Sequence, residues 1–246
     1  MITLGVDVGG TGVKAAPVET TTGEMNSERQ RIPTPQPSTP KAVLKVVRRL
    51  VKQFEWNGPI GVGVPAVVRD GVTLTAANIH KSWIGTNVRD MLAEATGCPV
   101  TVINDADAAG IAEMTFGAGK GRKGTVLVVT LGTGIGTALF HNGVLMPNTE
   151  LGHIELKGKD AEKYAADIVR KTEDLKWKDW AERVDEYLHE MERLFWPELI
   201  VVGGGVSRKH DKFLPRLTVK AEVVPAQMLN EAGIIGAALA ASVEAG

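Results

Sequence analysis

The sequence predicts an α/β protein made of two similar halves that face one cleft. The first observation is a repeated pattern of strand, glycine turn and strand, once over residues 2–16 and again over residues 125–140. In both, the β-branched and apolar residues before the turn are typical of a strand buried on both faces. The second observation is size, because 246 residues with 43% hydrophobic content suffice for one large or two small domains.

Composition narrows the class of protein. The formal net charge is −1, so no overall basic field points to nucleic acid or to an anionic membrane. A single cysteine, Cys98, allows no internal disulfide and indicates a reducing compartment. We find no signal peptide and no apolar run long enough to cross a bilayer. We therefore expect a cytoplasmic protein that binds neither nucleic acid nor a membrane.

The first glycine turn follows the strand at residues 2–8 and carries groups suited to phosphate. Its carboxylate, hydroxyl and ammonium groups come from Asp7, Thr11 and Lys14, around Gly9, Gly10 and Gly12. Such a set indicates a site for phosphate oxygens and for a metal ion, with Asp7 as the candidate Mg²⁺ ligand.

The second glycine turn follows the strand at residues 125–131. Gly132, Gly134 and Gly136 stand at alternate positions and leave backbone N–H groups bare, as a phosphate site requires, with Thr133 between them. By itself this stretch could also be an ordinary hairpin. The presence of two such turns in one chain favours phosphate binding.

The segment after the first hairpin is predicted to be a connector and then a helix. Residues 31–40 are rich in proline and therefore extended, although Arg31 and Thr34 could line the cleft. Ser38 or Thr39 can cap a helix with Pro40 in its first position, and apolar residues then recur at helical spacing as far as Phe54. The basic residues between them predict a solvated face rather than a polyanion track.

Two further strands follow. Residues 60–64 form one that ends in small residues, where a ligand could approach the backbone. In the loop at residues 76–79, Asn78 could hydrogen-bond a sugar hydroxyl or could simply form a turn. A helix over residues 87–96 closes at Gly97, and residues 100–103 form the next strand.

That strand ends in Asn104-Asp105-Ala106-Asp107, where a helix begins. A carboxylate at a strand end beside a helix N-terminus can accept the proton of a substrate hydroxyl. The alternative is that Asp105 or Asp107 is only the N-cap. Because two phosphate-type turns stand in the same chain, a base for phosphoryl transfer is the better interpretation.

Polar residues recur after the second hairpin. Glu150 and His153 stand three apart across Gly152, so both could point into one pocket and bind vicinal hydroxyls. A metal site is the rival interpretation, but no cysteine cluster follows to complete it. Residues 160–195 have a helical pattern whose aromatic positions we assign to the core.

The last third of the chain carries one more glycine run. A strand at residues 199–202 leads to Gly203, Gly204 and Gly205, which can admit a flat base or a phosphate chain. Arg208, Lys209 and Lys212 follow and could meet negative charge. Residues 222–225 form a final strand, and residues 231–238 begin a helix of small residues.

Taken together, these segments resemble the ROK family of sugar kinases. The segments that carry the resemblance are DVGGTGVK at 7–14, GVGVPAVV at 61–68, NDADAAG at 104–110, LGTGIGTALF at 131–140, ELGH at 150–153 and VVGGGVS at 201–207. RIPTPQPSTP, TAANIHKSWIGT, GAGKGRKG, MPNTELGHIEL and DKFLP are similar to the branch of that family that uses polyphosphate.

The resemblance implies the actin-like, ribonuclease-H-like ATPase fold, with two similar α/β domains flanking a cleft. We expect a small domain of residues 1–104 with the C-terminal helix at about 234–246, and a large domain of residues 105–233. The resemblance also suggests a homodimer.

The resemblance further implies roles for individual residues. Asp105 would be the general base that takes the proton of the sugar 6-hydroxyl. Asn104, Glu150, His153 and Glu162 would hold the sugar hydroxyls. The two glycine turns, with Asp7, Thr11 and Lys14, would hold donor phosphates, and Gly203 to Gly205 would border the nucleotide or the phosphate chain.

The substrates implied are glucose, with mannose as a second candidate, and polyphosphate or ATP with Mg²⁺. For polyphosphate, Lys14 and the basic loop Lys120, Arg122 and Lys123 are the candidate contacts, although such a loop is often merely solvated. Two alternatives stay open: an ATP-only sugar or amino-sugar kinase, and a sugar-sensing relative without catalysis.

One departure from the family pattern concerns a metal. Most bacterial members carry a cysteine-rich zinc motif after the histidine, whereas this chain has Lys157 to Ala161, KGKDA, in that place. We therefore expect no zinc site.

Overall fold

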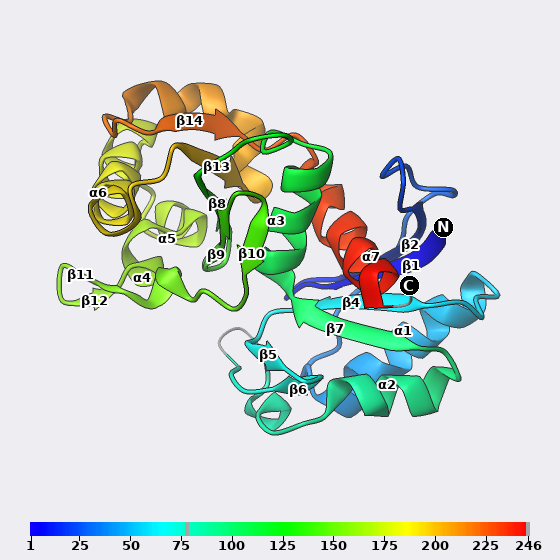
Figure 1. The fold of residues 1–246 in the computed structure, drawn as a ribbon. Helices are drawn as coiled ribbons and strands as arrows, with labels where there is room; N and C mark the ends of the chain where they lie inside the picture. The colour runs from blue at the N-terminus through cyan, green and yellow to red at the C-terminus, as the bar shows by residue number, and fades with distance from the viewer. Residues whose placement is uncertain (77–78, 245–246) are drawn as a thin grey trace. The chain divides into compact units, whose positions relative to one another are not determined.

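The structure, a computed structural model, describes residues 1–76 and 79–244. The chain divides into two compact units, Met1–Ala112 with Glu231–Gly246, and Glu113–Asn230. In Figure 1 the first unit runs from the blue N-terminus through the green strand β7 into helix α3 and also holds the red helix α7, and the second unit runs from the end of α3 to the orange segments. The domain boundaries expected from the sequence stay a prediction.

The first unit is built on a five-stranded sheet in the order β3-β2-β1-β4-β7. Its strands are β1 (Ile2–Val8), β2 (Val13–Glu19), β3 (Gln30–Ile32), β4 (Ile60–Val64) and β7 (Val100–Asn104). β1 and β2 pair antiparallel around the first glycine turn, whereas β1, β4 and β7 run parallel. Because parallel strands end at one edge, the turn, the end of β4 and Asn104 lie along the same edge.

Helices cover this sheet. Thr39 caps α1 (Pro40–Gln53), accepting the N–H of Ala42, as the sequence predicted. α2 (Val88–Thr96) runs from its Asn87 cap to Gly97, whose φ is +73°, also as predicted. The smaller elements of this unit are β5 (Val68–Arg69), β6 (Val72–Thr73) and the 3₁₀ turn η1 (Lys81–Trp83). α3 (Asp105–Thr115) follows β7 directly.

The C-terminal helix α7 (Ala232–Glu244) packs against β1 and β4 at backbone distance. A Cβ atom built on Gly5 would lie 2.0 Å from the carbonyl oxygen of Ile234, and one on Gly61 would lie 1.8 Å from that of Ala237. Only glycine in the strands permits this approach.

The second unit repeats the arrangement with the order β10-β9-β8-β13-β14. Its strands are β8 (Thr125–Leu131), β9 (Ile135–His141), β10 (Val144–Met146), β13 (Leu199–Gly203) and β14 (Glu222–Pro225). β8 and β9 pair antiparallel around the second glycine turn, and β8, β13 and β14 run parallel. The short strands β11 (Glu155–Leu156) and β12 (Lys159–Asp160) form a separate hairpin.

The helical pattern predicted over residues 160–195 is broken into α4 (Glu162–Ala165), α5 (Asp167–Thr172) and α6 (Trp177–Phe195). Extended residues Ala166 and Lys176 separate them. The break after α4 is stabilised because the indole N–H of Trp180 donates to the Ala165 carbonyl at 3.0 Å. Local periodicity could not reveal this contact with a later helix.

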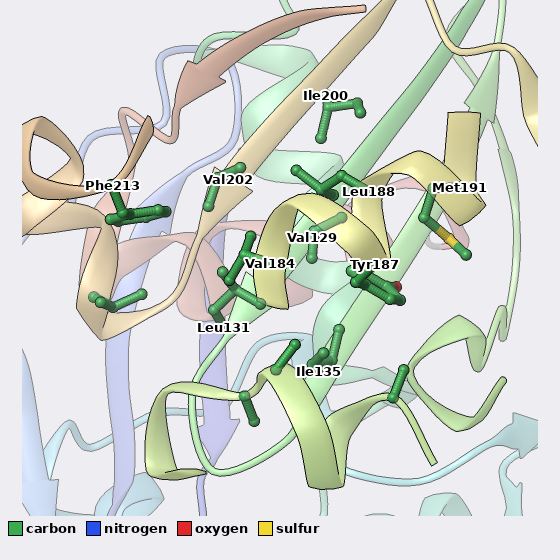
Figure 2. Close-up of a cluster of buried hydrophobic side chains, with 14 of the residues drawn as sticks. Val129, Leu131, Ile135, Val184, Tyr187, Leu188, Met191, Ile200, Val202 and Phe213 are labelled. Carbon is green, nitrogen blue, oxygen red and sulfur yellow. The ribbon is translucent and has the colours of Figure 1, made fainter. Parts of the chain in front are cut away.

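The core of the second unit lies between β8, β9, β13 and α6 (Figure 2). Trp180 and Tyr187 are fully buried there, which confirms the core assignment for these two, whereas Tyr164, Trp177 and Phe195 are partly buried and pack against the core. The 3₁₀ segments of this unit are η2 (Leu151–His153), η3 (Gly205–Lys212) and η4 (Leu214–Arg216), while η5 (Leu229–Glu231) leads into α7. None of the helices in the described part of the chain is both long and apolar enough to span a membrane.

Candidate active site

The first glycine turn is held by residues on both sides of it. The β1–β2 register sets Asp7 opposite Lys14, and their Oδ2 and Nζ atoms are 2.8 Å apart. The N–H of Gly9 closes the turn by donating to the carbonyl of Gly12 at 3.1 Å. A Cβ on Gly10 would meet nothing within 4 Å, so the backbone there is open to a ligand.

Two residues of the proline-rich connector support this turn. Arg31 Nη2 donates to the carbonyl of Thr11 at 2.8 Å, and Thr34 Oγ1 donates to that of Gly9 at 2.5 Å. The sequence suggested that these side chains could line the cleft. The structure gives them contacts with the turn backbone, so we assign them to shaping the first glycine turn.

Asn104, rather than an aspartate, caps α3. Its Oδ1 accepts the N–H groups of Ala106 at 2.8 Å and Asp107 at 3.0 Å, and its Nδ2 donates to the carbonyl of Ala66 at 3.2 Å. The alternative that Asp105 is only the N-cap thus loses its main support. Half-buried Asp105 begins the helix at the edge that also holds the first glycine turn.

The residues around Asp7 fit a magnesium ion that is held mainly by phosphate. Mg²⁺ is commonly bound by one or two carboxylates together with substrate phosphates and water. Asp7 supplies a carboxylate at the end of β1, beside the open backbone of Gly10, and Lys14 occupies one of its oxygens. The donor set therefore suits an ion that arrives with the phosphoryl donor.

The two glycine segments of the second unit lie at one edge of its sheet. β8 leads into Gly132 and the parallel strand β13 leads into Gly203 to Gly205. A Cβ on Gly204, whose φ is +83°, would lie 2.3 Å from the Leu131 carbonyl oxygen. Cβ atoms on Gly132 or Gly205 would meet nothing within 4 Å. The glycine run therefore packs against the end of β8 while open backbone remains on both sides of the contact.

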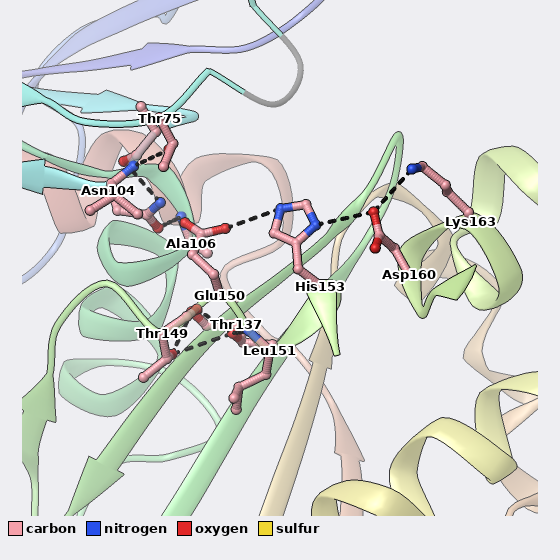
Figure 3. Close-up of polar contacts among 12 residues, drawn as sticks. Thr75, Asn104, Ala106, Thr137, Thr149, Glu150, Leu151, His153, Asp160 and Lys163 are labelled. Carbon is pink, nitrogen blue, oxygen red and sulfur yellow. Dashed lines mark hydrogen bonds and ion pairs between the residues drawn. The ribbon is translucent and has the colours of Figure 1, made fainter. Parts of the chain in front are cut away.

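Glu150 and His153 face each other, as Figure 3 shows, with Oε2 and Nε2 3.6 Å apart. The glycine between them is required because a Cβ on Gly152 would lie 2.1 Å from the Ile135 carbonyl oxygen. This packing seats η2 on the start of β9, next to the second glycine turn. Burial raises the pKa of the Glu150 carboxyl above its ordinary value; the His153 charge opposes this and the Glu162 charge adds to it.

Asp160 joins this pair, which the sequence did not predict. Its Oδ2 lies 3.8 Å from His153 Nδ1 and 3.0 Å from Lys163 Nζ (Figure 3). The bond from Lys163 holds the pKa of the Asp160 carboxyl below its usual value, with His153 acting in the same direction. His153 thus has a carboxylate near each ring nitrogen. Asp160 stands within the KGKDA segment, whose only signal in the sequence was its departure from the family pattern.

His153, Asp160 and Glu162 place one potential metal-ligand atom each within 4.8 Å of one another. The nearby Lys163 ammonium competes with a cation for the Asp160 carboxylate. The expectation that this chain has no zinc site stays a prediction.

Of the remaining predicted residues, the basic loop at residues 120–123 does not lie beside the glycine segments of the second unit. The basic loop Lys120, Arg122 and Lys123 precedes the start of β8, whereas the glycine turns follow the carboxyl ends of β8 and β13. Arg122 also pairs with Glu222 at 2.7 Å. Asn78 lies outside the described residues.

Comparison with known proteins places these features in a family. The profile of the ROK family matches residues 3–166. The chain is 51% identical over 238 residues to the polyphosphate glucokinase of Mycobacterium tuberculosis (strain CDC 1551 / Oshkosh), covering 96% of this chain and 90% of that protein.

Solved structures give the same result. The chain is similar to the inorganic polyphosphate/ATP-glucomannokinase from Arthrobacter sp. strain KM, with a TM-score of 0.96, 45% identity and coverage of 99% of both chains. A ROK family glucokinase from Streptomyces griseus, in complex with glucose and AMPPNP, matches with a TM-score of 0.84 at 24% identity, covering 99% of this chain and 100% of that one. The second match concerns the fold alone.

Proposed function

The chain belongs to the ROK family, and from that premise we propose that it is a glucokinase that transfers a phosphoryl group from inorganic polyphosphate to the 6-hydroxyl of glucose. The observation that carries the proposal is the 51% identity, over 96% of the chain, to a protein named polyphosphate glucokinase. Family membership also establishes the actin-like ATPase fold that the sequence motifs implied.

The mechanism assigns separate tasks to the residues of the two units. Asp105 accepts the proton of the attacking hydroxyl as that oxygen bonds to the terminal phosphorus of the donor. The bond from this phosphorus to the bridging oxygen breaks, and the shortened polyphosphate leaves with that oxygen. Backbone N–H groups of the two glycine turns, other than those of Gly9 and Gly132, which bond within their own turns, hold the donor oxygens together with the Lys14 ammonium. A bound magnesium ion would neutralise charge on the transferring phosphate, and Asp7 is the residue that would help to hold it.

Glu150 and His153 orient the sugar. A carboxylate oxygen accepts a hydrogen bond from a sugar hydroxyl, and the imidazole can donate or accept according to its tautomer. Asn104 and Glu162 are the further candidates. The Asn104 amide already bonds the first turn of α3 and the Ala66 carbonyl. Asn104 therefore also contributes to the site indirectly, because it fixes the position of Asp105 at the start of α3.

The first experiment is a comparison of donors. Purified protein is given glucose and magnesium with long-chain polyphosphate or ATP as the sole donor, and glucose 6-phosphate is measured. We expect turnover with polyphosphate, and with ATP as a second donor. Turnover with ATP alone would identify the chain as an ATP-only kinase, and glucose binding without turnover from either donor would identify a sugar sensor. Mannose in place of glucose tests the second acceptor.

The second experiment removes the proposed base. Asp105→Asn keeps the size of the side chain and should lower kcat by about 10²-fold to 10⁴-fold with either donor, the usual contribution of a general base. Asp70→Asn is the matched control because Asp70 is exposed and has a φ of +52°, which asparagine tolerates. Wild-type turnover by a folded Asp105→Asn protein would refute the mechanism.

The proposal also includes an oligomeric state and a cellular location. We propose a homodimer, which the family resemblance supports and which light scattering of the purified protein tests. A cytoplasmic location is supported by the single buried cysteine, and fractionation of cells that express the protein tests it.

A further inference from the structure

Three cationic side chains converge on one indole ring in the second unit. Arg170 Cζ lies 4.1 Å from the centre of the Trp177 ring, Lys212 Nζ 5.5 Å and Lys209 Nζ 6.0 Å. The ring stacks on Phe213 at 6.3 Å with an interplanar angle of 15°. The aromatic pair thus provides a fixed platform that offsets part of the repulsion between the cations.

The lysines of this cluster have no neutralising partners in the described part of the chain. Arg208, Lys209 and Lys212 are exposed, and the described residues place no carboxylate within ion-pair distance of them. Arg170 differs, since it pairs with buried Asp167 at 3.0 Å. Asp211 is the one acidic residue within η3. The segment therefore carries a local excess of positive charge in a chain whose net charge is −1.

The position of the cluster relates it to the glycine turns of the same unit. β13 ends at Gly203, η3 begins at Gly205, and Arg208, Lys209 and Lys212 stand within η3, whereas Arg170 stands in α5. The basic loop at residues 120–123 instead precedes β8, a strand of 7 residues. A strand of that length spans roughly 20 Å, so the loop lies at the opposite edge of the sheet.

We propose that Lys209 and Lys212, with Arg208, bind the phosphates of a polyphosphate chain that extend beyond those held by the glycine turns. The inference rests on the proposed function. Every internal phosphate of the chain carries a negative charge, so a long donor can reach a cation cluster that follows the glycine run. ATP ends after three phosphates and then continues as a nucleoside, so it gains little from the same cations. The site would favour long-chain polyphosphate over ATP.

The test is the double substitution Lys209→Gln with Lys212→Gln. We expect the KM for long-chain polyphosphate to rise by about threefold to thirtyfold, the range for two exposed charge contacts. The KM for ATP, the KM for glucose and kcat with ATP should stay at wild-type values. Restoring charge with Lys209→Arg and Lys212→Arg should recover most of the polyphosphate affinity.

Two matched controls remove the same amount of charge elsewhere. Lys41→Gln with Lys45→Gln neutralises two side chains on the outer face of α1 and should leave every constant unchanged. Lys120→Gln with Lys123→Gln tests the competing basic loop. An unchanged polyphosphate KM in the Lys209/Lys212 variant would overturn the inference. An equal rise of this KM in all three double variants would overturn it as well.

A binding measurement separates this inference from the proposed function. If wild-type protein shows no turnover with polyphosphate, the proposed function fails. The protein is then titrated with long-chain polyphosphate and binding is followed by tryptophan fluorescence. This measurement tests the proposed phosphate site at Lys209 and Lys212 independently of turnover. Weaker binding by the Lys209/Lys212 variant would support the site, and equal binding, or no binding by the wild type, would refute it.

Discussion

Among the single residues of the site, Glu150 gives the clearest link between burial and stability. Its pKa is raised chiefly because burial disfavours the charged carboxylate. The folded protein therefore holds this proton more tightly than the unfolded chain does. The stabilising contribution is fully present below the unfolded pKa and is lost as pH rises through the folded pKa.

Glu150→Gln should therefore raise the melting temperature slightly near pH 7.5 and leave it unchanged near pH 4, while weakening glucose binding. Glu155→Gln is the control, since Glu155 is exposed in the neighbouring strand β11. Thermal unfolding of the three proteins at both pH values checks the prediction. A variant that is less stable than wild type at neutral pH would contradict it.

The sequence was enough to propose most chemical groups of the candidate site but not the contacts that support them. Asp7, Asp105, Glu150 and His153 stood out because their residue types and their places beside strand ends or glycine turns were visible in the chain. The cap role of Asn104 depends on its side-chain rotamer, and the contact of Asp160 with His153 depends on a hairpin that folds back. Neither geometry is encoded in a local spacing.

At the scale of elements, the close packing of α7 on its sheet makes the strand glycines critical. Gly61→Ala would force its methyl group against the Ala237 carbonyl, because the new Cβ would lie 1.8 Å from the carbonyl oxygen. Overpacking of this kind costs about 1–3 kcal/mol or more. We expect a fall in melting temperature of roughly 2–12 °C for a chain of this size.

Gly10→Ala is the informative control for this element, because a methyl group there meets nothing within 4 Å. Its melting temperature should stay close to that of wild type, whereas its KM for the phosphoryl donor should rise. Calorimetry of both variants checks the prediction. Equal melting temperatures for Gly61→Ala and Gly10→Ala would show that the helix can shift to accommodate the methyl group.

Element by element, sequence patterns succeeded where local signals determine the structure. The strand over residues 125–131 and the helix between Asn87 and Gly97 were predicted because apolar runs, caps and glycine stops are local. The breaks at Ala166 and Lys176 were missed because the contact of Trp180 with Ala165 joins different helices. Tertiary contacts there override a periodic pattern that continues through the breaks.

Across the whole molecule, the prediction of two similar halves is confirmed by the sheets. In each unit an antiparallel hairpin surrounds a glycine turn and two parallel strands continue the sheet, in the orders β3-β2-β1-β4-β7 and β10-β9-β8-β13-β14. Each unit also has its own hydrophobic core. The sequence could show the repeated turn, but strand order depends on crossovers that periodicity does not specify.

Separate cores predict different behaviour for fragments of the chain. Residues 113–230 contain one complete core and its whole sheet, so this fragment should fold alone and unfold cooperatively. Residues 1–112 lack α7, which covers Gly5 and Gly61, so that fragment should be unstable because its sheet face is uncovered. Joining residues 231–246 to it through a flexible linker should restore folding.

Circular dichroism and chemical denaturation of the three fragments check this prediction. The fragment of residues 1–112 without α7 is the direct control for the linked form, since the two differ only in the helix and its linker. Cooperative unfolding of residues 1–112 alone would mean that α7 is dispensable for the first core. Failure of residues 113–230 to fold would mean that its core needs the rest of the chain, and the division into independently folding domains would then be wrong.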